Sequence, residues 1–158
     1  MPKKSAGILL FRGQGDSLEV LLVHPGGPFW AKKDERAWSI PKGEFEAEDP
    51  LEAARRELAE ETGAVAAGTP IPLAPIRQAG GKWVHGFALA QAFDPAELRS
   101  HTFTMEWPPR SGLVRAYPEV DRAEWFSLPV ARLKIVRGQV GFLEQLAGLM
   151  SVPDTRRA

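Results

Sequence analysis

The sequence has no cysteine, no net charge and no long apolar run, and each absence removes a class of protein. Without cysteine among its 158 residues, disulfide bonds and thiol catalysis are excluded. Lysine and arginine total 20 and so do aspartate and glutamate, so no overall field favours nucleic acid or an anionic membrane. No stretch approaches the ~20 apolar residues of a membrane-spanning helix, and the N-terminal apolar run is too short for a signal peptide. We therefore expect a cytoplasmic protein that binds neither nucleic acid nor a membrane.

The remaining composition is that of an ordinary globular domain. Hydrophobic residues make up 44% of the chain and charged residues 25%. The length suits one domain, which we place at 1–152, followed by a C-terminal tail at 153–158. Apolar patterns predict strands at 6–12, 18–24, 38–40, 64–75, 82–93 and 118–128, and helices at 129–136 and 139–150. The proline-containing stretch 100–112 is predicted to be a loop.

A further helix is expected directly after residue 49, and it carries the strongest chemical signal of the chain. Asp49 followed by Pro50 is typical of a helix start, and Gly63 of a helix end. At about 100° per residue, one stripe of this helix carries three carboxylates: Glu57, Glu60 and Glu61. Each like-charge pair costs an isolated helix roughly 0.2–0.5 kcal/mol. A hard cation such as Mg²⁺, which prefers oxygen ligands, would relieve this repulsion, whereas a solvated acidic face is the alternative interpretation.

The sequence of this helix resembles a known motif. The run from Arg56 to Ala64, RELAEETGA, is similar to the second half of the Nudix box, Arg-Glu-U-x-Glu-Glu-x-Gly-U with U apolar, at every fixed position. In the first half, Gly43 and Glu48 enclose four residues where the family pattern has five, so the difference lies in the loop before the helix. The segments 24–44 and 105–112 resemble a MutT-like bacterial branch of predicted nucleoside triphosphate pyrophosphohydrolases.

The resemblance implies both a fold and a reaction. The fold class is α/β, a Nudix-type α/β/α sandwich with a mixed sheet. The reaction is hydrolysis of a diphosphate bond in a nucleoside diphosphate linked to another moiety X, by water attacking phosphorus with Mg²⁺ or Mn²⁺ assisting. The implied metal ligands are the side chains of the helix and one backbone carbonyl, Gly43, Glu57, Glu60 and Glu61. Arg56 is expected to orient a box glutamate by a bidentate contact, and Glu48 to support the loop or an additional ion.

Candidate substrate-binding residues come from the turn and the loop before the box. Lys42 is the first candidate for a phosphate contact, with Arg36, Lys32 and Lys33 as weaker candidates, and solvated loop cations are the alternative interpretation. Trp30, like its neighbour Phe29, is expected either to stack on a base or to anchor the loop. The candidates for general base are, in falling order, Glu61, Glu106 and Glu119. The three histidines, His24, His85 and His101, are interpreted as structural or rim residues.

Two alternatives of different kinds stay open. The first keeps the chemistry and changes the substrate: a dinucleoside polyphosphate (Ap4A-like) hydrolase or a sanitising nucleoside triphosphate pyrophosphatase. The second is a Nudix-fold sensor that binds a nucleotide without cutting it, and the complete set of box glutamates with their arginine argues against it. The expected partner is a small nucleoside diphosphate or polyphosphate, and the expected assembly is a monomer or homodimer. The identity of X is not encoded in a motif.

Overall fold

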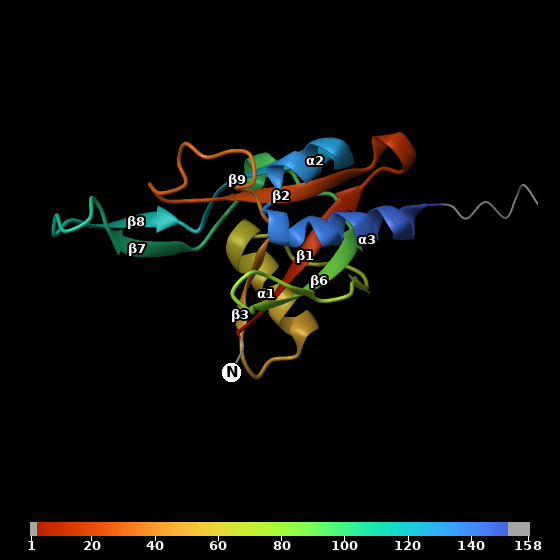
Figure 1. Cartoon of the computed structure of the whole chain (residues 1–158), viewed down its shortest axis with the longest axis horizontal. Coiled ribbons are helices and arrows are strands. Elements are labelled where there is room, and N and C mark those ends of the chain that lie inside the picture. The colour runs from red at the N-terminus through yellow and green to blue at the C-terminus, as the bar shows by residue number, and fades with distance from the viewer. Residues whose placement is uncertain (1–2, 152–158) are drawn as a thin grey trace, which may run out of the picture.

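The chain forms a mixed β-sheet with helices on both faces (Figure 1). The computed structural model describes residues 3–151, so the C-terminal tail predicted at 153–158 lies outside the described residues. The α/β/α sandwich with a mixed sheet that the sequence implies is therefore confirmed. Within residues 3–151, no helix combines the length and the apolar character needed to cross a bilayer.

The sheet has seven strands, and one parallel pair makes it mixed. They are β1 (Lys4–Arg12), β2 (Glu19–Pro25), β3 (Lys42–Phe45), β4 (Ile71–Pro72), β5 (Ile76–Arg77), β6 (Trp83–Ala90) and β9 (Val120–Ser127). Their order is β4-β6-β1-β2-β9, with β3 paired to β1 and β5 paired to β6. β1 and β6 run parallel, and the other described pairs run antiparallel. The central strand β1 therefore adjoins β2, β3 and β6.

The apolar run of β1 is continuous because the strand is buried on both faces. Successive side chains of a strand point to opposite faces, so Leu9 and Phe11 join the core beneath α3, while Ile8 and Leu10 join the core beneath α1. The helices are α1 (Pro50–Thr62), α2 (Leu128–Lys134) and α3 (Val140–Met150), with short 3₁₀ turns η1 (Gly15–Ser17), η2 (Pro95–Glu97) and η3 (Arg137–Gln139). A Leu9→Ala change would cost about 2–5 kcal/mol of unfolding free energy.

Helix α1 begins and ends at the residues that its sequence predicts. The carboxylate of Asp49 accepts hydrogen bonds from the N–H groups of Leu51 at 3.1 Å and Glu52 at 3.4 Å. At the other end, Gly63 has a left-handed φ of 85°, and its N–H donates to the Ala59 carbonyl. These local signals fix which turn of the helix carries each carboxylate.

One prediction was wrong, because residues 102–106 form a strand and not a loop. β7 (Thr102–Glu106) pairs with β8 (Val114–Pro118) in a two-stranded ribbon that projects from the body, at the left of Figure 1. Pro108 and Pro109, which favoured a loop, occupy only the turn between the strands. The turn expected at Lys42 and Gly43 also proves to be a strand, because both residues pair with β1 as part of β3. Other stretches differ in extent: 38–40 contributes only isolated bridges, and 64–75 contains only the two-residue β4.

Candidate functional site

Arg56 joins three of the predicted carboxylates through one guanidinium. Its Nη1 donates to Glu57 Oε2 at 2.6 Å and to Glu60 Oε2 at 2.9 Å. Its Nε and Nη2 donate to the two oxygens of Glu48 at 3.0 and 2.7 Å. The bidentate contact is therefore made to Glu48 in the loop, whereas the two helix glutamates share one nitrogen. The shorter loop still brings Glu48 to Arg56.

Gly43 lies against the carboxylate of Glu57, at the point where β3 meets α1. A Cβ built at position 43 would lie 2.0 Å from Glu57 Oε1, which is too close for any side chain. Glu57 itself is buried, with 7% of its surface exposed. Burial, with the charge of Glu60, raises the pKa of Glu57 against the lowering effect of Arg56. The backbone of Gly43 and this buried carboxylate are thus neighbours, as the first half of the box requires.

Glu61 lies on the next part of the helix face and reaches toward β3. Its Oε1 accepts a hydrogen bond from the backbone N–H of Lys42 at 3.2 Å. Burial, aided by the charges of Glu57 and Glu119, raises the pKa of Glu61 to about 8, although Lys42 acts in the opposite direction. The contact with Lys42 therefore does not offset the cost of burying this negative charge.

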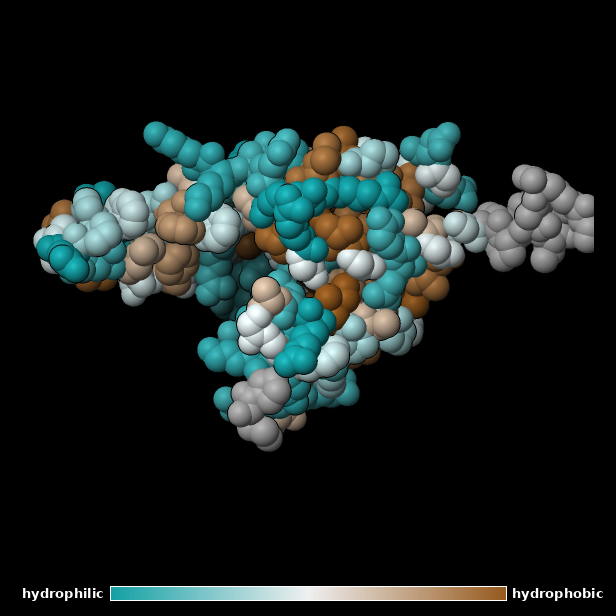
Figure 2. Space-filling model, in the orientation of Figure 1, coloured by the Kyte–Doolittle hydropathy of each residue, from teal (hydrophilic) through white to brown (hydrophobic). Residues whose placement is uncertain are grey.

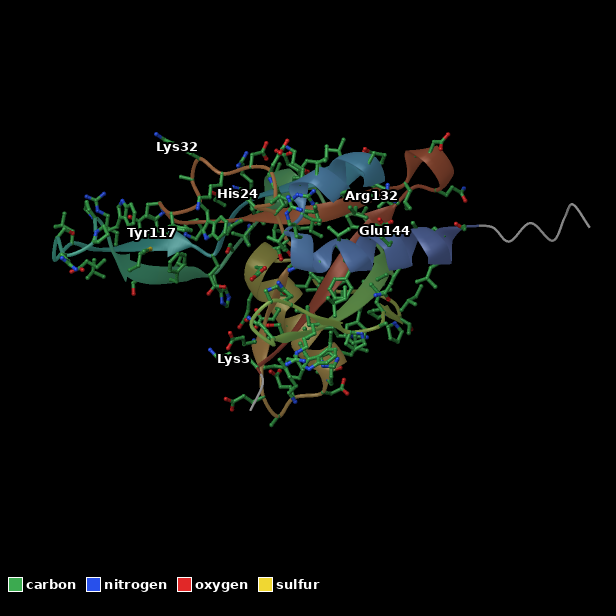
Figure 3. All side chains as sticks on the ribbon, viewed as in Figure 1. Lys3, His24, Lys32, Tyr117, Arg132 and Glu144 are labelled. Carbon is green, nitrogen blue, oxygen red and sulfur yellow. The ribbon has the colours of Figure 1, made fainter. Side chains whose placement is uncertain are left out.

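The side chains of the predicted phosphate-binding cations point to different parts of the molecule. Lys42 lines the cleft beside Glu61, and burial, together with the charge of Lys82, lowers the pKa of the Lys42 ammonium. Arg36 points to α2, where its Nη1 donates to the Arg132 carbonyl at 2.7 Å. Lys32 points outward from the body (Figure 3).

The cleft at the box has two compartments, which meet at the carboxylates. The polar compartment, about 260 Å³, includes Ser39, Lys42, Gln78 and Gln139 in its lining. The ribbon compartment, about 430 Å³, lies between the loop after β2 and strand β7. Both compartments are lined by four shared residues: Pro25, Trp30, Glu61 and Glu119. Figure 2 shows the recess between the projecting ribbon and the body.

The loop after β2 supplies the aromatic side of the cleft. Trp30 packs partly against the core and also lines both compartments, so it both anchors the loop and faces the cleft. Phe29 is 57% exposed and lines the ribbon compartment. The ammonium of Lys33 lies 3.8 Å from the Phe29 ring centroid and 4.9 Å from that of Trp30. Lys33 therefore stacks on aromatic rings and does not line either compartment.

The two later candidates for the general base, Glu106 and Glu119, lie in different places. Glu119 lines both compartments, and its carbonyl accepts a hydrogen bond from Gly26. The carboxylate of Glu106 instead accepts hydrogen bonds from the N–H groups of Arg110 and Gly112, both at 3.0 Å, within the turn of the ribbon. Of the later acids, the structure brings Glu119 and not Glu106 to the cleft.

Sequence reasoning missed several side chains that line the cleft. Phe103 and Met105 were assigned to a loop, although the alternation of Phe103, Met105 and Trp107 is a strand signal. Gln78 and Gln139 carry no motif, and only the fold brings them together. A larger hollow of about 710 Å³ lies beyond the end of α1, between Gly63 and Arg99, and none of the predicted site residues lines it.

Within residues 3–151, no three histidine, aspartate or glutamate side chains are grouped closely enough to hold a metal ion. Arg56 occupies one oxygen each of Glu57 and Glu60. Glu61 faces the cleft and the Lys42 backbone instead. The described arrangement is therefore a set of carboxylates bridged by a guanidinium.

The fold and the box define the class of protein. The NUDIX domain family model matches residues 1–146, which is most of the chain. The chain therefore belongs to the Nudix family.

Individual relatives support the fold. The NUDIX domain of Shewanella oneidensis NrtR, complexed with ADP ribose, is 18% identical with a TM-score of 0.66, and the match covers 96% of this chain and 90% of that chain. An Ap4A hydrolase of C. elegans is 21% identical with a TM-score of 0.60, covering 93% of this chain and 96% of that chain. A curated octanoyltransferase of Myxococcus xanthus is 33% identical over 133 residues, which is 82% of this chain and 32% of that protein. The chain thus spans about a third of that relative's length.

Proposed function

We propose that the chain hydrolyses the diphosphate bond of a nucleoside diphosphate linked to a second group X, with Mg²⁺ or Mn²⁺ held by the box residues. The observation that carries this proposal is the position of Glu61. Its carboxyl group lies where the two compartments of the cleft meet, on the same helix as the Arg56 cluster. If each compartment holds one part of a substrate, the bond that joins the two parts would lie next to the Glu61 carboxyl group.

The residues present fit a hard divalent cation. Glu57, Glu60 and Glu48 share one guanidinium, so the cluster keeps an excess of negative charge. The pKa values of Glu57 and Glu61 are both raised, which marks carboxylates that a cation would stabilise. The candidate ligands are the carboxylates of the helix and one carbonyl: Glu57, Glu60, Glu61 and Gly43. Nudix hydrolases in general use divalent metals, and the bound ion would neutralise the diphosphate and make a water molecule more acidic.

The chain's own residues supply the remaining steps. Arg56 fixes Glu57 and Glu60 relative to each other and ties them to the loop through Glu48. Glu61, with a pKa near neutrality, is suited to accept the proton of the attacking water. Lys42 lies beside it in the polar compartment, where its ammonium can contact phosphate.

The other predicted site residues differ in how readily they could contact a substrate. Glu119 is the second candidate base, because it lines both compartments. A phosphate contact by Arg36 would require its guanidinium to leave the Arg132 carbonyl. Trp30 is positioned to meet a ring of the substrate from the loop side of the cleft.

The comparisons favour a nucleotide substrate with a second group. One similar structure binds ADP-ribose and another belongs to an Ap4A hydrolase, and in both compounds a chain of phosphates links a nucleoside to a further group. A dinucleoside polyphosphate (Ap4A-like) hydrolase, a sanitising nucleoside triphosphate pyrophosphatase and a nucleotide sensor are the competing proposals. The intact box of Arg56 and its glutamates supports the enzyme over the sensor. A monomer or homodimer in the cytoplasm stays a prediction.

A substrate screen tests the proposal. ADP-ribose, NADH, nucleotide sugars, dinucleoside polyphosphates and nucleoside triphosphates are each incubated with Mg²⁺ or Mn²⁺, and phosphate release is measured after phosphatase treatment. Turnover of at least one diphosphate-linked compound is expected for the wild type, with most of it lost in Glu57→Gln. Absence of turnover with either metal across the whole panel would contradict the proposal.

A further inference from the structure

The β7–β8 ribbon presents one apolar face to the cleft. Phe103 and Met105 lie on the same side of β7, because residues two apart in a strand share a face. Tyr117 is the cross-strand partner of Phe103, and the two ring centroids are 6.0 Å apart. Phe103 and Met105 line the ribbon compartment, whose lining from the loop side includes Phe29 and Trp30. Two walls that carry aromatic rings therefore bound one hollow.

Two glycines dock the base of the ribbon against the loop. A Cβ at position 26 would lie 1.9 Å from the Pro118 carbonyl oxygen, and a Cβ at position 27 would lie 3.0 Å from the Phe103 ring. Gly26 also donates its N–H to the Glu119 carbonyl at 2.9 Å. A two-stranded ribbon is marginally stable by itself in water, so this docking is what fixes Phe103 at the cleft.

The lining of the ribbon compartment restricts its occupant. Its side chains are apolar or aromatic, apart from Glu61 and Glu119 at the end shared with the polar compartment. Among the described lining residues there is no lysine, arginine, amide or hydroxyl side chain. A phosphate group needs cations and a sugar needs several hydrogen-bonding groups, so neither suits this hollow. A flat aromatic ring suits this hollow, because it can pack between the aromatic walls and against the methionine sulfur.

We propose that the ribbon compartment binds an aromatic ring of X, a second nucleobase in the simplest case. This inference rests on the proposed function, because it places the phosphate chain at Glu61 and Glu119, where the compartments meet. The first nucleoside then occupies the polar compartment, where the buried amide oxygen of Gln78 has no hydrogen-bond partner among the described residues. The substrate class is thus a pair of ring-bearing groups joined through phosphates. The second ring is held by its faces and not its edges, so the enzyme tolerates different bases at that end.

A matched pair of substrates isolates the second ring. Diadenosine tetraphosphate and adenosine 5′-tetraphosphate share one adenosine and the same number of phosphates. They differ in the second adenosine, which in adenosine 5′-tetraphosphate is replaced by a free terminal phosphate oxygen, so the effect of Phe103→Ala on each substrate is the deciding comparison. With Mg²⁺, the wild type is expected to have the higher kcat/KM for diadenosine tetraphosphate. Phe103→Ala should lower that value on the order of tenfold and leave the value for adenosine tetraphosphate unchanged, since a stacked ring has been lost. Phe103→Trp, which keeps an aromatic face, should retain the preference.

The control variant is Thr104→Ala, on the opposite, exposed face of the same strand. It should leave both substrates unaffected. If both substrates are hydrolysed equally, or Phe103→Ala lowers both by the same factor, the inference is overturned while the proposed function stands. If neither substrate is hydrolysed, calorimetric binding decides: weaker binding of diadenosine tetraphosphate alone to Phe103→Ala upholds the ring site and counts against hydrolysis. Equal binding by Phe103→Ala and the wild type overturns the ring site as well.

Discussion

His24 Nδ1 lies 2.8 Å from Asp121 Oδ1, at the edge where β2 meets β9. Its other ring nitrogen, Nε2, lies 2.6 Å from the carbonyl oxygen of Lys33 in the loop after β2. The two ring nitrogens thus tie the side chain both to β9 and to the loop. The ring is fully buried and lies edge-on to Trp38. Figure 3 shows His24 beside the loop that brings Phe29 and Trp30 to the cleft.

The first prediction follows from this pair of contacts. Asparagine at position 24 can keep at most part of them, so the Asp121 carboxylate or the Lys33 carbonyl loses its contact with this buried side chain. We expect His24→Asn to lower the unfolding free energy by about 1–3 kcal/mol. It should also raise KM more than it lowers kcat, because the loop carries Trp30. Urea unfolding and steady-state kinetics measure the two effects.

His101→Asn is the matched control. His101 is exposed, and its reported contacts are those of its backbone N–H and carbonyl. Asparagine preserves those backbone contacts, so we expect stability and KM close to wild type. Equal effects of the two histidine variants would show that the His24 contacts do not hold the loop.

The features predicted from the sequence are those that local chemistry decides. Asp49 and Pro50 specify the start of α1 and Gly63 specifies its end, and this register sets the glutamate face. The structural interpretation of His24 is confirmed, because the ring is buried and both of its nitrogens make hydrogen-bond contacts. Its partner Asp121 lies 97 residues away, and no local pattern identifies such a pair.

The features that were missed depend on contacts between distant segments. Phe103 reaches the cleft because Gly26 and Gly27 leave room for the ribbon, a relation that spacing along the chain does not encode. Arg36 was grouped with Lys42 as a cation near the box. Its left-handed backbone, with φ of 61°, and its bond to the Arg132 carbonyl direct it to α2. Proximity in sequence therefore did not predict direction in space.

A second prediction concerns the guanidinium at the centre of the box. Lysine at position 56 keeps the charge but cannot make the bidentate contact to Glu48 while also bridging Glu57 and Glu60. We expect Arg56→Lys to lower kcat/KM tenfold or more, since hydrogen bonds to charged groups are worth about 1.5–3 kcal/mol each. Arg55→Lys is the control, because Arg55 makes no ion pair within residues 3–151. Equal activity of the two variants would contradict a positioning role for Arg56.

A third prediction isolates the ammonium of Lys42. The contact from residue 42 to Glu61 is made by the backbone N–H, and Lys42→Ala preserves it. The variant therefore removes the side chain from the polar compartment without breaking that bond. If the ammonium contacts phosphate, KM for the best substrate rises while the unfolding free energy changes little. Unchanged KM and kcat would show that this lysine does not contact the substrate.

A fourth prediction uses the raised pKa of Glu61. With a pKa of about 8, the folded protein binds this proton more tightly than the unfolded chain, whose glutamate has an ordinary pKa of about 4.3. The resulting stability is fully present below the ordinary value and is lost as pH rises through about 8. In metal-free buffer, the melting temperature of wild type relative to Glu61→Gln should therefore fall between pH 5 and pH 8.5. Parallel curves for the two proteins would show that Glu61 titrates normally.

The last prediction links the carboxylate cluster to the metal. If Glu57 is a ligand, Mg²⁺ well above its dissociation constant should stabilise the wild type on the order of 1–3 kcal/mol by binding only the folded state. Glu57→Gln should lose most activity and most of this stabilisation. Without metal it should be about as stable as wild type, because burial already favours the neutral form of Glu57 and glutamine can still accept from Arg56.

Glu52→Gln removes one charge from an exposed position in the first turn of the same helix. It controls for the general effect of a less acidic α1, and it should keep both the activity and the response to Mg²⁺. Thermal unfolding of the three proteins with and without Mg²⁺, alongside turnover, gives the comparison. A wild type whose melting temperature ignores Mg²⁺, or a Glu57→Gln variant that responds as fully as wild type, would remove Glu57 from the metal site. Because glutamine at position 57 keeps an oxygen that can accept from Arg56, the variant tests the loss of charge at this position and not the loss of the Arg56 contact.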